Sequence, residues 1–218
     1  MSTNLGPGDP MAAATTAVSP WNIANYLTVA RLLLVPVFLV LLLGREGEDT
    51  GWRIGAALVF ALAAYTDRID GQLARSRGLV TSFGKLADPI ADKALTGAAF
   101  LGLSLLDELA WWVTVLVLVR EIGVTLLRFF VIRHGVMPAS RGGKLKTLLQ
   151  GVAILLYVLP LTGALATART GVMVLAVVVT LVTGADYVVR AVTLRRTSPR
   201  AAMKRERRAA RSAGPSRV

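Results

Sequence analysis

Long runs of apolar residues constrain the fold of this chain more than any other feature of its sequence. Between Ile23 and Leu43 the only charged side chain is Arg31. Further apolar runs, a few of them interrupted by charges, cover residues 54–65, 94–106, 109–132, 148–167 and 172–189. A helix of about 20 residues crosses the hydrocarbon core of a bilayer. The sequence therefore predicts an all-α, polytopic membrane protein with six transmembrane helices, two of which carry polar ends that extend beyond the hydrocarbon.

The composition supports this class and excludes several kinds of site. Hydrophobic residues make up 54% of the chain and charged residues only 17%, whereas soluble domains carry about 25% charged residues. The absence of cysteine excludes disulfides, thiolate metal sites and cysteine nucleophiles. His134 is the single histidine, which excludes a histidine-rich metal site.

The distribution of charge divides the chain into three segments. Residues 1–19 contain no Lys or Arg, lack the charged region of a signal peptide, and are expected to form a disordered lead-in. Residues 20–194 form the predicted six-helix membrane domain. Residues 195–218 form a basic tail that contributes +8 of the net charge of +12. Such a tail suits anionic lipid headgroups, so we expect no nucleic-acid partner.

The positive-inside rule orients the predicted helices. Basic residues gather in the stretches 68–85 and 133–146 and in the tail. The alternate loops hold few cations, among them Arg53 and Arg169, and also carboxylates such as Glu108. Because cytoplasmic loops carry the excess of Lys and Arg, both termini are expected in the cytoplasm.

Four carboxylates in two short pairs indicate a metal site. Asp67 and Asp70 are three residues apart, and Asp88 and Asp92 are four apart, so on helices each pair lies on one face. Two antiparallel helices would bring the four together at the cytoplasmic membrane edge, where unneutralised charge is costly. Divalent cations would neutralise them, and all-oxygen ligation suits Mg²⁺ or Mn²⁺ rather than Zn²⁺.

The residues between the two pairs indicate a diphosphate pocket. Gly71, predicted to end the polar part of the second helix, and Gly84 permit close approach of a ligand to the backbone. Ala74 is small, and Arg75 offers a bidentate fork for phosphate oxygens. An ion-pair cluster at a helix hairpin would explain the carboxylates without a ligand, but it does not require glycines at both helix ends.

The spacing of these residues, D-x2-D-G-x2-A-R-x8-G-x3-D-x3-D over Asp67 to Asp92, resembles the motif of the CDP-alcohol phosphatidyltransferase family. The resemblance implies a homodimeric six-helix membrane enzyme of a bacterial-type cell membrane, with its active site at the cytoplasmic end of the second and third helices. It implies two metal ions and transfer of a phosphatidyl group from a CDP-linked donor to an alcohol, with release of CMP. The implied metal ligands are Asp67, Asp70, Asp88 and Asp92, with Asp92 also the general base. The implied donor-binding residues are Asp67, Gly71, Ala74, Arg75 and Gly84.

Three further segments resemble members of the family that join CDP-diacylglycerol to glycerol 3-phosphate. They are WNIANYLTVARLLLVPVF at 21–38, REIGVTLLRFF at 120–130 and PASRGGKLKTLLQGVA at 138–153. Charges embedded in apolar helices usually face a cavity or a partner, which independently favours an anionic acceptor. The expected acceptor-phosphate residues are Arg31, Arg120, Arg141, Lys144 and Lys146. Positive-inside loop charge remains the other interpretation of these cations.

Other functions stay open at this point. Related enzymes with this architecture would use phosphatidylglycerol or inositol phosphate as the acceptor. Membrane prenyltransferases also bind diphosphates through aspartates and Mg²⁺, but they do not call for this spacing. A cation transporter would need carboxylates near the bilayer midplane, whereas the aspartates here follow short apolar runs and adjoin a basic loop.

Overall fold

A computed structural model describes residues 23–76, 82–131 and 141–197, and in these ranges the chain is helical without strands. The elements are α1 (Ile23–Leu43), the 3-10 helix η1 (Gly44–Gly47), α2 (Thr50–Ser76), α3 (Ser82–Leu105), α4 (Trp111–Val131), α5 (Arg141–Val158) and α6 (Ala164–Thr197). The prediction of an all-α fold is confirmed. The predicted lead-in at 1–19, most of the basic tail and His134 lie outside the described residues.

The helices that carry the aspartate motif extend well past their apolar runs. The prediction that the polar part of the second helix ends at Gly71 is wrong, because α2 continues to Ser76. One glycine inside a helix costs only about 1 kcal/mol relative to alanine, and the following Gln72 and Leu73 are good helix formers. Arg75 therefore lies on α2 rather than in a loop.

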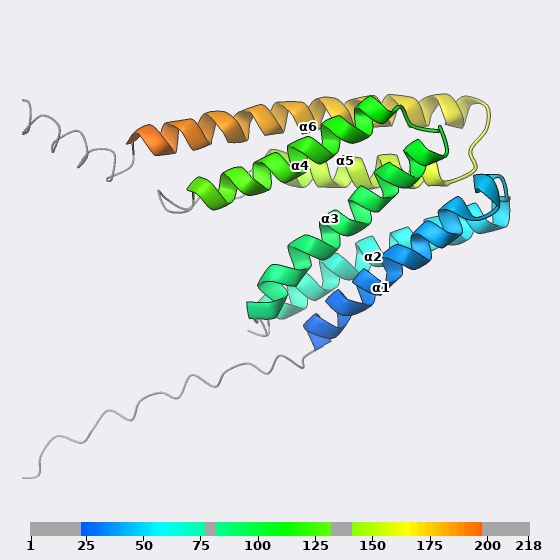
Figure 1. Ribbon diagram of the computed structural model, residues 1–218, viewed down its shortest axis with the longest axis horizontal. Coiled ribbons are helices and arrows are strands. Elements are labelled where there is room, and N and C mark those ends of the chain that lie inside the picture. Colours follow the sequence, from blue (N-terminus) through cyan, green and yellow to red (C-terminus); the bar gives the residue numbers. More distant parts are fainter. Residues whose placement is uncertain (1–22, 77–81, 132–140, 198–218) are drawn as a thin grey trace, which may run out of the picture.

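The helices pack in two groups that meet along α2, α3 and α5. In Figure 1, α1 lies against α2 and α3, while α6 lies against α4 and α5. Short turns join successive helices at one end of the molecule. The buried core includes Phe38 and Phe60, whose ring centroids are 5.7 Å apart, together with Phe100 and Ile154.

Many large apolar side chains face outward instead of into the core. Leu33, Leu58, Trp112 and Val182 are examples, each well over a third exposed. By length and composition, two segments qualify as membrane spans: Asn25–Gly47 and Ala164–Leu194. The described parts of the other helices do not meet that criterion, so the number of spans remains a prediction.

A network of ion pairs and hydrogen bonds joins the helices at the end of the molecule where the short turns lie. Arg53 is buried, and its guanidinium donates to the carbonyl oxygens of Val158 at 2.8 Å and Tyr157 at 2.5 Å. The same group pairs with Glu108 at 2.7 Å, and Glu108 pairs with Arg169 at 2.9 Å. Arg169 lies on α6, not in the preceding loop, and stacks 4.7 Å from the centroid of the Tyr157 ring. The network joins α2, the α3–α4 turn, α5 and α6.

Candidate active site

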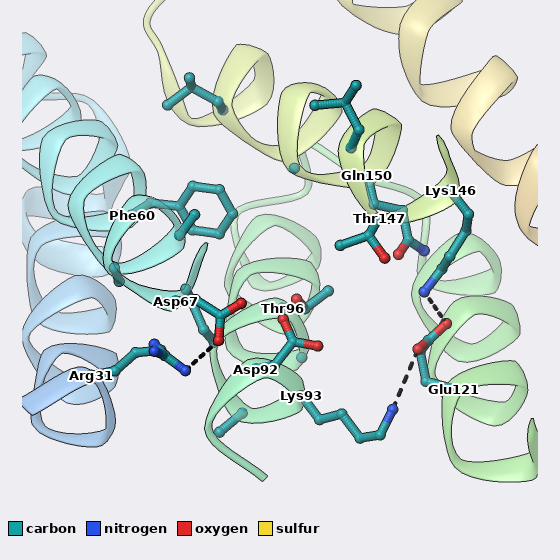
Figure 2. Close-up of a pocket in the computed structure, with 18 of the residues that line it drawn as sticks. Arg31, Phe60, Asp67, Asp92, Lys93, Thr96, Glu121, Lys146, Thr147 and Gln150 are labelled. Carbon is teal, nitrogen blue, oxygen red and sulfur yellow. Dashed lines mark hydrogen bonds and ion pairs between the residues drawn. The ribbon is translucent and has the colours of Figure 1, made fainter. Parts of the chain in front are cut away.

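A cavity of about 630 Å³ lies between α2, α3, α4 and α5, with Arg31 of α1 at its edge. The apolar lining residues include Phe60, Leu95, Leu118 and Leu155. The polar lining residues come from five helices, α1 to α5, and Figure 2 labels them. They are Arg31, Asp67, Asp92, Lys93, Thr96, Glu121, Lys146, Thr147 and Gln150.

The first predicted ligand, Asp67, is held by a cation from the neighbouring helix. Arg31 Nη1 lies 2.5 Å from Asp67 Oδ1, and the Arg31 side chain is only 1% exposed. The Asp67 side chain is 37% exposed and lines the cavity. A charge-assisted contact with a buried guanidinium fixes the position of this more open carboxylate.

The two aspartate pairs lie on the two predicted helices. Asp67 and Asp70 belong to α2, and Asp88 and Asp92 belong to α3. Of these, Asp67 and Asp92 line the cavity, and Figure 2 shows both carboxylates directed into it. The side chains of Asp70 and Asp88 lie outside the description. Among the side chains that are described, no three His, Cys, Asp or Glu residues gather as a metal-binding group.

The described donors nonetheless fit a divalent cation. Carboxylate oxygens are the ligands that Mg²⁺ and Mn²⁺ prefer, and Asp67 and Asp92 reach the same cavity from different helices. Arg31 pairs with Asp67 Oδ1, and the Asp67 carboxylate opens onto the cavity. The remaining donor-side predictions fall on α2 for Gly71, Ala74 and Arg75, and on α3 for Gly84, all outside the described side chains.

A second charged group lies on the other side of the cavity. Glu121 of α4 pairs through Oε1 with Lys146 Nζ at 2.5 Å and through Oε2 with Lys93 Nζ at 3.5 Å. Figure 2 draws both pairs, with Lys93 reaching from α3 and Lys146 from α5. The Lys146 side chain is only 8% exposed. The cavity thus has carboxylates from the motif on one side and ammonium groups around one glutamate on the other.

Arg120 faces away from the cavity although it adjoins Glu121 in the sequence. Its guanidinium donates to the Thr180 carbonyl oxygen at 3.2 Å and to Thr183 Oγ1 at 2.9 Å, both on α6. Its Nη1 also pairs with Glu121 Oε1 at 3.0 Å. Gly184 leaves room for the Arg120 side chain, because a Cβ there would lie 3.2 Å from Arg120 Cγ.

The predicted acceptor residues therefore separate into distinct places. Lys146 and Arg31 both line the cavity. Lys146 lies beside Glu121, and Arg31 lies beside Asp67. Arg120 and Lys144 do not line it, and the Arg141 side chain lies outside the description. Sequence analysis missed Lys93, Glu121, Thr147 and Gln150 as lining residues. The position of Glu121 within an apolar run could have indicated that it lines the cavity, because charges embedded in apolar helices usually face a cavity or a partner.

A sequence profile of the CDP-alcohol phosphatidyltransferase family matches residues 21–182, which include every residue that lines the cavity. The chain belongs to the CDP-alcohol phosphatidyltransferase family. It is 56% identical over 170 residues to a Mycobacterium tuberculosis protein named probable phosphatidylglycerophosphate synthase, a match covering 78% of this chain and 81% of the relative. It is 39% identical over 171 residues to a Rickettsia typhi CDP-diacylglycerol–glycerol-3-phosphate 3-phosphatidyltransferase, covering 76% and 94% of the two chains.

A third relative of this CDP-alcohol phosphatidyltransferase carries another name. A Streptomyces coelicolor protein named cardiolipin synthase (CMP-forming) is 38% identical over 120 residues, covering 54% of each chain. Membership of the family makes the chain an enzyme of this transferase class. The family generally uses divalent metal ions, in keeping with the carboxylates Asp67 and Asp92 in the cavity.

Proposed function

We propose that this enzyme transfers the phosphatidyl group of CDP-diacylglycerol to glycerol 3-phosphate, giving phosphatidylglycerophosphate and CMP. The observation that carries the proposal is the 56% identity to the mycobacterial relative over 170 residues, which cover 78% of this chain. The cavity supplies what the two substrates need, namely apolar side chains, carboxylates for metal ions and ammonium groups for an anion.

The donor occupies the motif side of the cavity in this proposal. The diacylglycerol portion lies against apolar lining residues such as Phe60 and Leu155. Asp67 and Arg75 bind the CDP-diphosphate end, and the small residues Gly71, Ala74 and Gly84 leave space for it on α2 and α3. Arginine suits this task because its planar guanidinium binds phosphate oxygens in pairs.

Asp67, Asp70, Asp88 and Asp92 would hold two Mg²⁺ or Mn²⁺ ions. When bound, such ions neutralise charge on the diphosphate and polarise its phosphorus–oxygen bonds. Arg31 holds the Asp67 carboxylate in place for this role through their 2.5 Å ion pair. Binding of these ions by carboxylates requires no histidine or cysteine ligand.

Asp92 acts as the general base in a direct, in-line displacement. It accepts the proton of the acceptor hydroxyl, and the hydroxyl oxygen then bonds to the phosphorus that carries diacylglycerol. The bond from that phosphorus to the bridging oxygen breaks, and CMP leaves. No covalent enzyme intermediate is needed, since the chain has no cysteine and its single histidine lies far from the motif in the sequence.

Lys146 binds the phosphate of glycerol 3-phosphate, because it lines the cavity opposite the aspartates. Arg120 does not line the cavity, so it acts on acceptor binding indirectly, through its ion pair with Glu121. Residues 20–194 form the catalytic domain of a multi-pass protein of a bacterial cell membrane. Six spans and a homodimer are part of the proposal, with both termini and the cavity's motif end in the cytoplasm.

A reaction with purified protein tests the assignment. The protein is incubated with CDP-diacylglycerol, Mg²⁺ and one of three acceptors: glycerol 3-phosphate, phosphatidylglycerol or inositol phosphate. CMP release with glycerol 3-phosphate alone is the expected result. Release with phosphatidylglycerol instead would favour the second candidate, a cardiolipin-forming enzyme, which the Streptomyces relative brings into consideration.

A further inference from the structure

Glu121 is the shared partner of three cations, and its contacts with Lys93 and Lys146 have no part in the catalytic scheme above. We propose that Glu121 is a positioning residue that presents the ammonium groups of Lys93 and Lys146 to the phosphate of the acceptor. The inference rests on the proposed function, because it concerns the acceptor of that reaction.

The geometry places both lysines around one carboxylate inside the cavity. Lys146 Nζ lies 2.5 Å from Glu121 Oε1, and Lys93 Nζ lies 3.5 Å from Oε2. The three residues come from α5, α3 and α4, and all three line the cavity. A lysine side chain carries about 2 kcal/mol of rotamer entropy, so two unrestrained ammonium groups would not stay together. A common carboxylate keeps both at the cavity.

Glu121 is itself anchored from outside the cavity. Arg120 Nη1 contacts Glu121 Oε1 at 3.0 Å, and the rest of that guanidinium is bound to α6 through Thr180 and Thr183. The contacts therefore run from α6 through Arg120 and Glu121 to the two lysines. This arrangement gives Arg120 an indirect part in acceptor binding, although it does not line the cavity.

The charge of the cluster matches a phosphate monoester. Arg120, Lys93 and Lys146 with Glu121 carry a net charge of +2. A phosphate monoester carries about −1.5 to −2 near pH 7, whereas a phosphodiester lipid carries a single negative charge. The cluster therefore complements glycerol 3-phosphate better than a phosphodiester acceptor, and Lys93 joins Lys146 as a phosphate ligand.

The first test compares Glu121→Gln with Asp186→Asn in the full chain. The control also replaces an ion-paired carboxylate by an amide, but Asp186 pairs with Arg190 on α6 and does not line the cavity. We expect Glu121→Gln to raise the KM for glycerol 3-phosphate about tenfold or more and to leave the KM for CDP-diacylglycerol within about twofold. Asp186→Asn should change neither KM. Equal changes in both KM values for Glu121→Gln would overturn the inference.

The second test asks whether Glu121 acts through the lysines. In a Lys93→Met/Lys146→Met background, Glu121→Gln should lower kcat/KM for glycerol 3-phosphate by less than about threefold, because the groups that it positions are already gone. The same loss in both backgrounds would overturn the inference. If Glu121→Gln does not fold, Lys93→Met alone decides, since that side chain is 34% exposed: a raised KM for glycerol 3-phosphate supports the proposal, and an unchanged KM refutes it.

The wild-type reaction separates this inference from the proposed function. A wild-type enzyme that releases CMP with another acceptor, but not with glycerol 3-phosphate, would overturn the proposed function and this inference together. A wild-type enzyme that uses glycerol 3-phosphate, with a Glu121→Gln variant of unchanged KM, would overturn this inference alone.

Discussion

Arg31 and Asp67 form an ion pair of 2.5 Å in which the cation is buried and the anion opens onto the cavity. The arginine comes from α1 and the aspartate from the motif on α2, so the packing of these two helices sets the position of a predicted metal ligand. The pair places Arg31 beside a proposed metal ligand, and the acceptor-phosphate role of Arg31 stays a prediction.

Replacing Arg31 by Ala should lower both stability and activity. Removal of the guanidinium leaves a space in the α1–α2 packing and takes the partner from Asp67, at a cost of about 1–3 kcal/mol in the free energy of unfolding. Arg31→Lys should recover part of the activity, because it restores the charge but not the planar fork. Thermal unfolding in detergent and CMP release measure the two effects. An alanine variant with wild-type values for both would contradict the role assigned to the pair.

Asp92→Asn should reduce transfer by about 10²–10⁴-fold, the range typical of a lost general base. The amide has nearly the same size as the carboxylate but cannot accept the proton. Binding of CDP-diacylglycerol, measured with a labelled donor, should remain detectable. Near-normal turnover of the variant would remove Asp92 from the base role.

Lys146→Met should raise the KM for glycerol 3-phosphate about tenfold, since its ammonium group lines the cavity opposite the motif. Arg120→Met should lower the melting temperature, because Arg120 joins α4 to α6 through Thr180 and Thr183. It should raise the KM for glycerol 3-phosphate less than Lys146→Met does, because Arg120 acts through Glu121. Initial rates at varied acceptor concentration, together with unfolding curves, distinguish the two variants. The reverse pattern would assign direct acceptor binding to Arg120.

Removal of divalent cations with a chelator should abolish CMP release, and Mg²⁺ or Mn²⁺ should restore it. Asp67→Asn should raise the Mg²⁺ concentration needed for half-maximal rate, since a neutral amide is a weaker ligand than a carboxylate. The measurement is the rate of CMP release over a Mg²⁺ titration. Full activity in the presence of the chelator would exclude the metal-assisted mechanism.

Glu108→Gln should destabilise the protein without altering either KM. The carboxylate joins the buried Arg53 to Arg169, and loss of a charge-assisted contact to a buried group costs about 1–3 kcal/mol. A lower melting temperature with unchanged kinetics is the expected result. A selective change in the KM for one substrate would show that this network takes part in binding.

The sequence predicts the helices and the motif well because both are local patterns. Apolar runs mark each helix, and the i, i+3 and i, i+4 spacings place the aspartate pairs on α2 and α3. The contacts between helices depend on tertiary packing, which local sequence patterns do not predict. For this reason one predicted role, acceptor-phosphate binding, was given to three residues that lie apart: Arg31 beside Asp67, Arg120 against α6 and Lys146 in the cavity. The contacts of Glu121 with Lys93 and Lys146 were not predicted.

The charge network around Arg53 has a mechanical consequence for the cavity. Arg53 and Asp67 are 14 residues apart on α2, or about 21 Å along the helix axis. The network ties one end of α2 to α5, and the Arg31–Asp67 pair ties the other end to α1. A change at either attachment would shift the aspartates of α2 relative to Lys146 on α5. A residue such as Arg53, which does not line the cavity, therefore helps to set the spacing between its two charged sides.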